Sequence, residues 1–271
     1  SQGRKRLWAG ALDVLWRMRR DGPAPDVVAC NAAITACKKG AAVEQALDLL
    51  GEMRRWLLHP DVVTYNVAIG ACAAGRRPES ALQLLGEMQR ERLPPDVVSF
   101  GTAINACQRC CCWEEALALL KKMALDRVEA SVIACNSAAS ACDKGLQGKR
   151  ARELLGGMRR GGPEPDVITF NAVISASGAG LGWRQGLDLL LLLRGSGLNP
   201  DAVTCGAATS ACERGSQWLL ALQQLRDMRP ASLKLNVITC AAAVSACGGA
   251  AEWRRALELL AAGRRRAVLP N

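Results

Sequence analysis

The chain has 271 residues, half of them apolar, and its 35 lysines and arginines outnumber its 25 aspartates and glutamates. Its longest leucine run, Leu189 to Leu193, is far shorter than the ~20 apolar residues that cross a bilayer, so the sequence predicts no membrane-spanning helix. The net charge of +10 favours a polyanionic partner without identifying it.

The sequence repeats with a period of 35 residues. The dipeptide Pro-Asp marks the register, at Pro25, Pro60, Pro95, Pro165 and Pro200. A fixed period of this size predicts stacked supersecondary units rather than one globular core. We expect residues 1–26 to be the C-terminal part of a truncated block, with a helix from about Leu7, and seven complete blocks to follow: 27–61, 62–96, 97–131, 132–166, 167–201, 202–236 and 237–271. Because no polar capping helix follows the last block, we expect the chain to be a fragment of a longer array.

Each block predicts two short helices. In the second block, apolar residues lie at helical spacing from Val63 to Gly75, where a glycine favours a helix end. A second stripe runs through Ala81 and Met88 and stops before Pro94. Two amphipathic helices of about 12 residues cannot bury their apolar faces alone, so such pairs must stack. The tenth position of every block is alanine, which allows close packing between helices.

The 13 cysteines follow the repeat. Most occupy the fourth or eleventh position of a block, where other blocks have Ser, Tyr or Phe, so we interpret them as packing residues in a reducing compartment. Cys107 and Cys110 have CxxC spacing, but the single histidine, His59, lies in a distant turn. We therefore predict no metal site, because zinc needs four converging ligands.

Over its whole length the chain resembles the pentatricopeptide repeat family, P-type. The residues that carry the resemblance are VVTYN from Val62, Gly75, ALQLL from Ala81, Met88 and the closing Pro95-Asp96. A tetratricopeptide array has period 34, and this chain never shifts to it. The resemblance implies an all-α fold, a right-handed α-solenoid superhelix of stacked antiparallel helix pairs. It also implies that each block binds one base of single-stranded RNA.

In that family the fifth and last residues of a block read the base. Four blocks have the Asn and Asp pair that the family associates with uracil: Asn31 with Asp61, Asn66 with Asp96, Asn136 with Asp166, and Asn171 with Asp201. An amide can donate to uracil O4 and accept from N3–H, while the carboxylate orients it. Three blocks depart from the pattern and should read weakly or not at all: Gly101 with Ser131, Gly206 with Asn236, and Ala241 with Asn271. The expected preference, 5′ to 3′, is UUNUUNN.

The resemblance assigns two further sets of residues. Second-position residues of successive blocks would sandwich each base: Val28, Val63, Val98, Ile133, Ile168, Val203 and Ile238. Basic residues near the end of the first helix would bind phosphate: Lys39, Arg109, Lys144 and Arg214. Branched aliphatic walls should hold bases less tightly than aromatic platforms do.

Simpler explanations exist for both reading positions. Asp, Ser and Asn are good helix N-caps, and each last residue lies directly before a predicted helix. The recurring asparagines could instead form a ladder between blocks, although asparagine is a mediocre helix former without a local reason to recur.

We expect a non-enzymatic RNA-binding protein that needs no cofactor and no small-molecule substrate. The sequence offers no carboxylate pair or nucleophile with a partnering base. The family suggests a role in RNA processing, stability or translation in a mitochondrion or chloroplast, with other RNA-processing proteins as further partners. Two alternatives remain: a protein- or peptide-binding solenoid scaffold, and the RNA-targeting arm of a larger RNA-processing enzyme.

Overall fold

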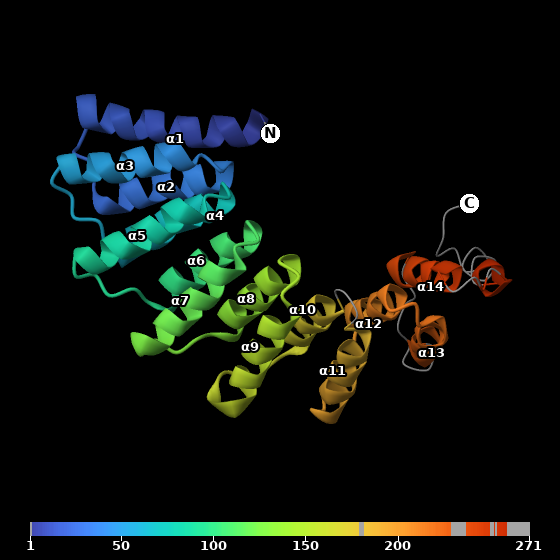
Figure 1. Ribbon diagram of the computed structural model, residues 1–271. Coiled ribbons are helices and arrows are strands. Elements are labelled where there is room, and N and C mark those ends of the chain that lie inside the picture. Colours follow the sequence, from blue (N-terminus) through green and yellow to red (C-terminus); the bar gives the residue numbers. More distant parts are fainter. Residues whose placement is uncertain (1, 179–181, 229–236, 250–251, 253, 259–271) are drawn as a thin grey trace. The chain divides into compact units, whose positions relative to one another are not determined.

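The structure, a computed structural model, describes residues 2–178, 182–228, 237–249, 252 and 254–258 (Figure 1). The regular elements in this part of the chain are α-helices, which confirms the predicted all-α class. The chain divides into two compact units, Ser1–Ala141 and Cys142–Asn271. Within each unit helix pairs stack on one another, which is the arrangement of an α-solenoid.

The helices follow one another as the repeat predicts. The first unit contains α1 (Gln2–Asp21), α2 (Val27–Gly40), α3 (Val43–Arg55), α4 (Val62–Ala74), α5 (Pro78–Arg90), α6 (Val97–Arg109), α7 (Trp113–Leu125) and most of α8 (Val132–Lys144). The second contains α9 (Gly148–Gly161), α10 (Val167–Ser177), α11 (Trp183–Gly195), α12 (Ala202–Arg214), α13 (Trp218–Met228) and α14 (Val237–Gly249). None of these described helices combines the length and the apolar character needed to cross a membrane.

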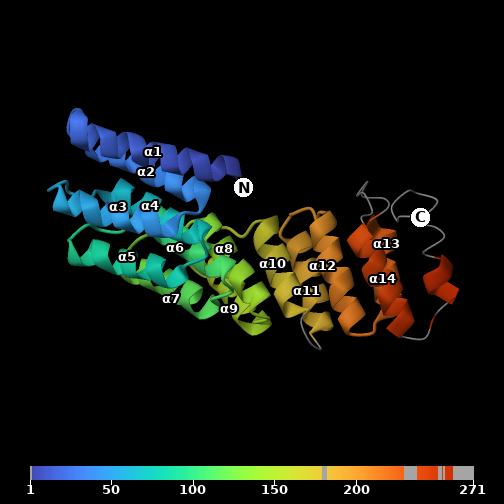
Figure 2. The ribbon, with the colours of Figure 1, turned by 90° about the horizontal axis from the view of Figure 1, so that it is seen from above.

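Two layers run through each stack. The first helices of successive blocks pack on one another, α2 on α4 and α4 on α6 in the first unit, α10 on α12 and α12 on α14 in the second. Each second helix packs against this layer, as α3 does on α2 and α4. Figures 1 and 2 show α3, α5 and α7 following one another beside the first helices. One surface of each unit is therefore made by first helices alone.

The N-terminal helix is longer than predicted. Helix α1 begins at Gln2, five residues before Leu7. Lys5 occupies the position that carries Gly40, Gly75 and Gly215 in complete blocks. Lysine has a high helix propensity, so a helix that begins before Lys5 is favoured.

Acidic N-caps set where the first helices begin. The Asp61 carboxylate accepts a hydrogen bond from the Thr64 backbone N–H at 2.7 Å, and the Thr64 hydroxyl group completes a capping box. Four first helices share this arrangement, with the caps Asp61, Asp96, Asp166 and Asp201. The capping function expected for the last position of the block is therefore present.

Glycine ends the first helix for a reason other than the one predicted. Gly75 has φ −85°, and the left-handed residue is its neighbour Arg76, with φ 57°. A Cβ atom at Gly75 would lie 2.0 Å from Val43 Cγ2, and one at Gly215 would lie 2.3 Å from Trp183 Cδ1. At Gly75 and Gly215 a larger residue would thus clash, because the second helix of the preceding block approaches each of these points closely.

Small and sulfur-containing side chains fill the core. Ten cysteines, all at the fourth or eleventh position, are buried, whereas Cys110, Cys111 and Cys112 lie at the turn between α6 and α7. The tenth-position alanines are buried in six of the seven blocks: Ala71, Ala106, Ala141, Ala176, Ala211 and Ala246. These residues are the packing positions that the sequence indicated.

A buried tyrosine joins the first two blocks. Tyr65 is 0 % exposed, and its hydroxyl group accepts a hydrogen bond from Arg54 Nη2 at 2.5 Å. The same guanidinium lies 2.8 Å from Glu87 Oε2 and 2.9 Å from Glu91 Oε1. Arg54 on α3 thereby links α4 and α5 of the next block through one polar network.

The titration of Tyr65 tests this network directly. Burial, assisted by nearby Glu91, raises the pKa of Tyr65 to about 12 from an ordinary value of 10.0. The stability that Tyr65 contributes should be complete below pH 10 and lost as the pH rises towards 12, because the unfolded chain loses that proton first. Tyr65 is the single tyrosine, so phenolate absorbance reports it alone. A folded-state midpoint near 10, the same as in denaturant, would contradict the burial.

Candidate nucleic-acid interface

A row of exposed aliphatic side chains follows the first-helix surface of each unit. Each lies at the second position of its block and is between 56 % and 76 % exposed: Val28, Val63, Val98, Ile133, Ile168 and Val203. The side chain of Ile238 lies outside the described residues, although α14 includes the position. Single exposed apolar residues are ordinary, but the same position in six blocks has no explanation in the core. The row therefore has the character of a ligand-binding surface.

The fifth-position asparagines lie three residues further along the same helix face. Asn66 Nδ2 donates a hydrogen bond to Asp96 Oδ1 at 3.2 Å, and Asn171 Nδ2 donates to Asp201 Oδ1 at 3.3 Å. The same Asp96 oxygen accepts from the Ser99 backbone N–H at 2.7 Å. One carboxylate therefore caps the next helix and orients the asparagine amide, so capping does not exclude a role in base recognition.

The carboxylates of these pairs are held in their charged form. Burial alone raises the pKa of each group, but hydrogen bonds from the capped helix and from the paired asparagine lower it further than burial raises it. The net pKa lies below the ordinary value for Asp61, Asp96 and Asp201. At neutral pH each therefore acts only as an acceptor and fixes which amide atom faces it.

Two buried asparagine oxygens in the described part of the chain have no hydrogen-bond donor. Among the described residues, Asn31 Oδ1 and Asn171 Oδ1 are buried and have no hydrogen-bond partner, whereas Asn66 Oδ1 accepts from the Ser99 hydroxyl group. A buried acceptor without a partner indicates a place for water or for a ligand N–H group. Asn136 lies half-buried on α8, and Asp166 caps α10.

The three divergent blocks differ from one another. Gly101 is open, since a Cβ atom added there would meet no atom within 4 Å, whereas one at Gly206 would lie 3.3 Å from Thr239 Cγ2. Ser131 caps α8 by accepting from the Ala134 backbone N–H at 3.2 Å. Ala241 is exposed on α14, and the partners expected for the last two blocks, Asn236 and Asn271, lie outside the described residues.

Two of the four predicted phosphate-binding residues also have a structural role. Arg109 Nη1 donates to the Ala73 carbonyl oxygen at 3.4 Å, and Arg214 Nε donates to the Gly178 carbonyl oxygen. Each arginine thereby satisfies the C-terminal end of the preceding first helix, where the helix dipole favours a positive charge. Each guanidinium has five N–H donors, so further donors remain for a phosphate. Lys39 and Lys144 are exposed at the corresponding positions.

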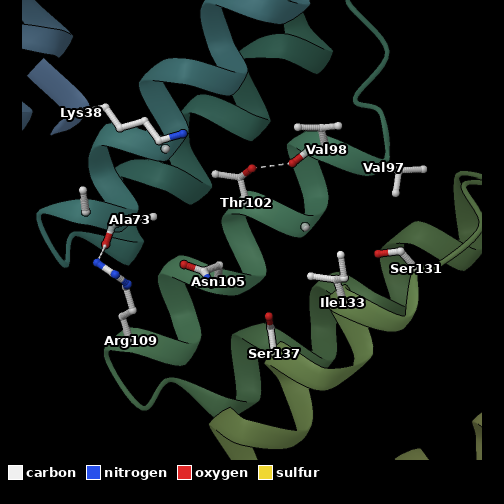
Figure 3. A pocket seen from close by; sticks show the side chains of 13 residues that line it. Lys38, Ala73, Val97, Val98, Thr102, Asn105, Arg109, Ser131, Ile133 and Ser137 are labelled. Atoms are coloured by element: carbon white, nitrogen blue, oxygen red, sulfur yellow. Dashed lines mark hydrogen bonds between the residues drawn. The ribbon is translucent and has the colours of Figure 1, made fainter. Parts of the chain in front are cut away.

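A hollow opens in the first unit beside the third block, and we call it the Gly101 hollow. Its volume is about 550 Å³, and its lining comes from α2, α4, α6 and α8 (Figure 3). It includes the predicted residues Val98, Gly101 and Ile133. It also includes Lys38 and Asn105, which the sequence analysis missed. The sequence did contain a signal for Asn105, because it lies one helical turn after Gly101, the position that lacks the asparagine.

Comparison with family models places the chain among repeat proteins. A model described as PPR repeat family matches residues 25–74 and 60–109, one described as Pentatricopeptide repeat domain matches 118–179, and one described as PPR repeat matches 98–128. Together these matches extend from residue 25 to residue 179, which is more than half of the chain. No curated protein matches the chain significantly.

Solved structures share the fold. The crystal structure of the pentatricopeptide repeat protein PPR10 from maize is 24 % identical, with a TM-score of 0.68 over 97 % of this chain and 43 % of that one. The PPR domain of Arabidopsis thaliana protein-only RNase P 1, solved in complex with tRNA, is 13 % identical, with a TM-score of 0.54 over 69 % of this chain and 95 % of that one. The chain thus spans less than half the length of the maize protein.

Proposed function

Because the chain belongs to the pentatricopeptide repeat family, we propose that it binds single-stranded RNA along the surface made by its first helices, one base per block. The observation that carries the proposal is the asparagine whose amide is oriented by a charged aspartate, as at Asn66 with Asp96 and at Asn171 with Asp201. An oriented amide offers one donor and one acceptor, which is the pattern that complements uracil O4 and N3–H.

The proposed sequence preference is UUNUUNN, read 5′ to 3′ from the first block to the seventh. Four blocks carry the Asn and Asp pair, and the bases of the first, second and fifth blocks would lie between exposed aliphatic residues of neighbouring blocks. Cytosine lacks the N3 proton and should be the second choice at those positions. The blocks with Gly206 and Ala241 offer no amide or hydroxyl group at the fifth position and should contribute little.

Charge and fold support RNA as the ligand. The chain carries a net charge of +10, and a polyanion gains from such a surface by releasing counterions. The Arabidopsis PPR domain that shares the fold was solved with tRNA. In the cell we propose a role in RNA processing, stability or translation within a mitochondrion or chloroplast. The chain itself would supply recognition, as a binding protein or as the targeting arm of a larger enzyme.

The salt dependence of binding tests the electrostatic part of the proposal. If Lys39, Arg109, Lys144 and Arg214 each neutralise one phosphate, the logarithm of the association constant should fall against the logarithm of salt concentration with a slope of about −3, from ~0.7 per contact. Replacing Lys39 and Lys144 by alanine should make the slope shallower by about half. Binding that does not change with salt would be incompatible with phosphate contacts at these positions.

A further inference from the structure

The third block departs from the simple pattern. Gly101 takes the place of the asparagine found at the fifth position of four blocks, and a Cβ atom added there would meet nothing within 4 Å. The resulting Gly101 hollow, with its volume of about 550 Å³, falls within the roughly 300–1,000 Å³ typical of small-molecule pockets. The third block therefore has room for a whole nucleobase where four other blocks have an asparagine side chain.

An amide is still present in this block, but it lies one helical turn further on. Asn105 follows Gly101 by four residues on α6, so it lies on the same face about 6 Å along the helix axis. Asn105 Nδ2 donates to Gln108 Oε1 at 3.3 Å, which orients the amide and leaves a second N–H and the oxygen for a ligand. Other blocks have no amide at this position; they carry Thr35, Gly70, Ser140, Ser175, Ser210 and Ser245.

The walls of the hollow suit a nucleotide. Val98 and Ile133, which are 58 % and 76 % exposed, provide apolar contacts for a base. Figure 3 shows Lys38 and Arg109 on one side of the hollow and Ile133 on the other, with Asn105 between them. No carboxylate is among the residues that line it in the described part of the chain. A base could thus enter towards Asn105 while its phosphate stays near the two cations.

We propose that the Gly101 hollow selects a purine as the third nucleotide and that Asn105 is the residue that reads it. This inference rests on the proposed RNA-binding function and changes the preferred sequence from UUNUUNN to UURUUNN, where R is a purine. A single-ring pyrimidine placed between Val98 and Ile133 would fall short of an amide displaced by one turn. The second ring of a purine extends the base towards Asn105, whose amide N–H can donate to N7, an acceptor that adenine and guanine share.

The test uses the full chain and four RNAs of the form UUXUUAA, in which X is A, G, C or U. Fluorescence anisotropy should give dissociation constants at least about fivefold lower for the purine RNAs than for the pyrimidine RNAs. About fivefold is the smallest discrimination expected from a well-placed amide contact with a base. Asn105→Ala should bring the four constants together. Ser245→Ala changes the same position in the seventh block, on an exposed residue, and should leave the purine preference intact.

A second variant fills the hollow without removing Asn105. Gly101→Asn places an amide where no atom lies within 4 Å of the new Cβ, so the fold should be retained, and the preference should move from purine towards uracil. If wild-type protein selects uracil at the first, second, fourth and fifth nucleotides but treats all four bases alike at the third, the purine inference is wrong and the proposed function stands. Equal affinity for every RNA at every position would overturn both.

Discussion

Replacing Asn66 and Asn171 together by alanine should weaken binding of the uracil-containing RNA by about 30-fold, or ~2 kcal/mol, at ~1 kcal/mol for each base contact. Each asparagine donates to the aspartate that closes its block, so the double variant loses two amides that are already oriented for a base. Affinity for the same RNA with its uracils changed to adenines should hardly change. Anisotropy titrations of both RNAs measure the difference.

Two control variants separate recognition from folding. Gln83→Ala removes an exposed amide from α5, a second helix outside the proposed surface, and should leave both affinities unchanged. Asn66→Thr beside Asp96 should turn that position towards guanine, as the family pattern implies. If the double alanine variant lost affinity equally for all RNAs and also had a lower unfolding temperature than the wild type, the loss of affinity would come from damage to the fold.

Gly148→Ala should destabilise the second unit by about 1–3 kcal/mol, the usual cost of overpacking. A Cβ atom at this position would lie 2.7 Å from the Ala176 carbonyl oxygen and 2.8 Å from Ser177 Cα. Both contacts are with the backbone of α10, which cannot move aside as a flexible side chain could. Thermal and urea unfolding, followed by circular dichroism, measure the change.

Gly157→Ala is the matched control on the same helix, α9. Nothing lies within 4 Å of a Cβ atom there, so the substitution should stabilise the protein by up to about 1 kcal/mol through helix propensity alone. Opposite signs for the two substitutions are expected. If both stabilised the protein, the close approach of α9 and α10 would be disproved.

The repeat made most of the fold predictable. Its period indicated helix pairs, and local signals set their limits, since Asp61 and Asp96 each precede the first residue of a helix. Gly75 marked a helix end, but the sequence could not show why, because the reason is a contact with Val43 of the preceding block. Contacts between blocks depend on how closely successive pairs approach one another, and a period does not give that distance.

The same limit applies to the candidate site. The second-position row and the Asn and Asp pairs could be located from their positions in the block. The hydrogen bond from Arg109 to the Ala73 carbonyl oxygen and the Gly101 hollow arise between helices of different blocks. Asn105 was missed because it departs from the repeat pattern, and a pattern-based prediction follows what the blocks share.

The most direct test of the central claim is a fluorescence-anisotropy titration with a short single-stranded RNA containing UUAUUAA. The comparison is the same RNA with its uracils changed to adenines, at low and at moderate salt. We predict tighter binding of the uracil-containing RNA at both salt concentrations, and weaker binding of each RNA as salt increases. Equal affinity for the two RNAs, or no binding of either, would contradict base recognition by the Asn and Asp pairs.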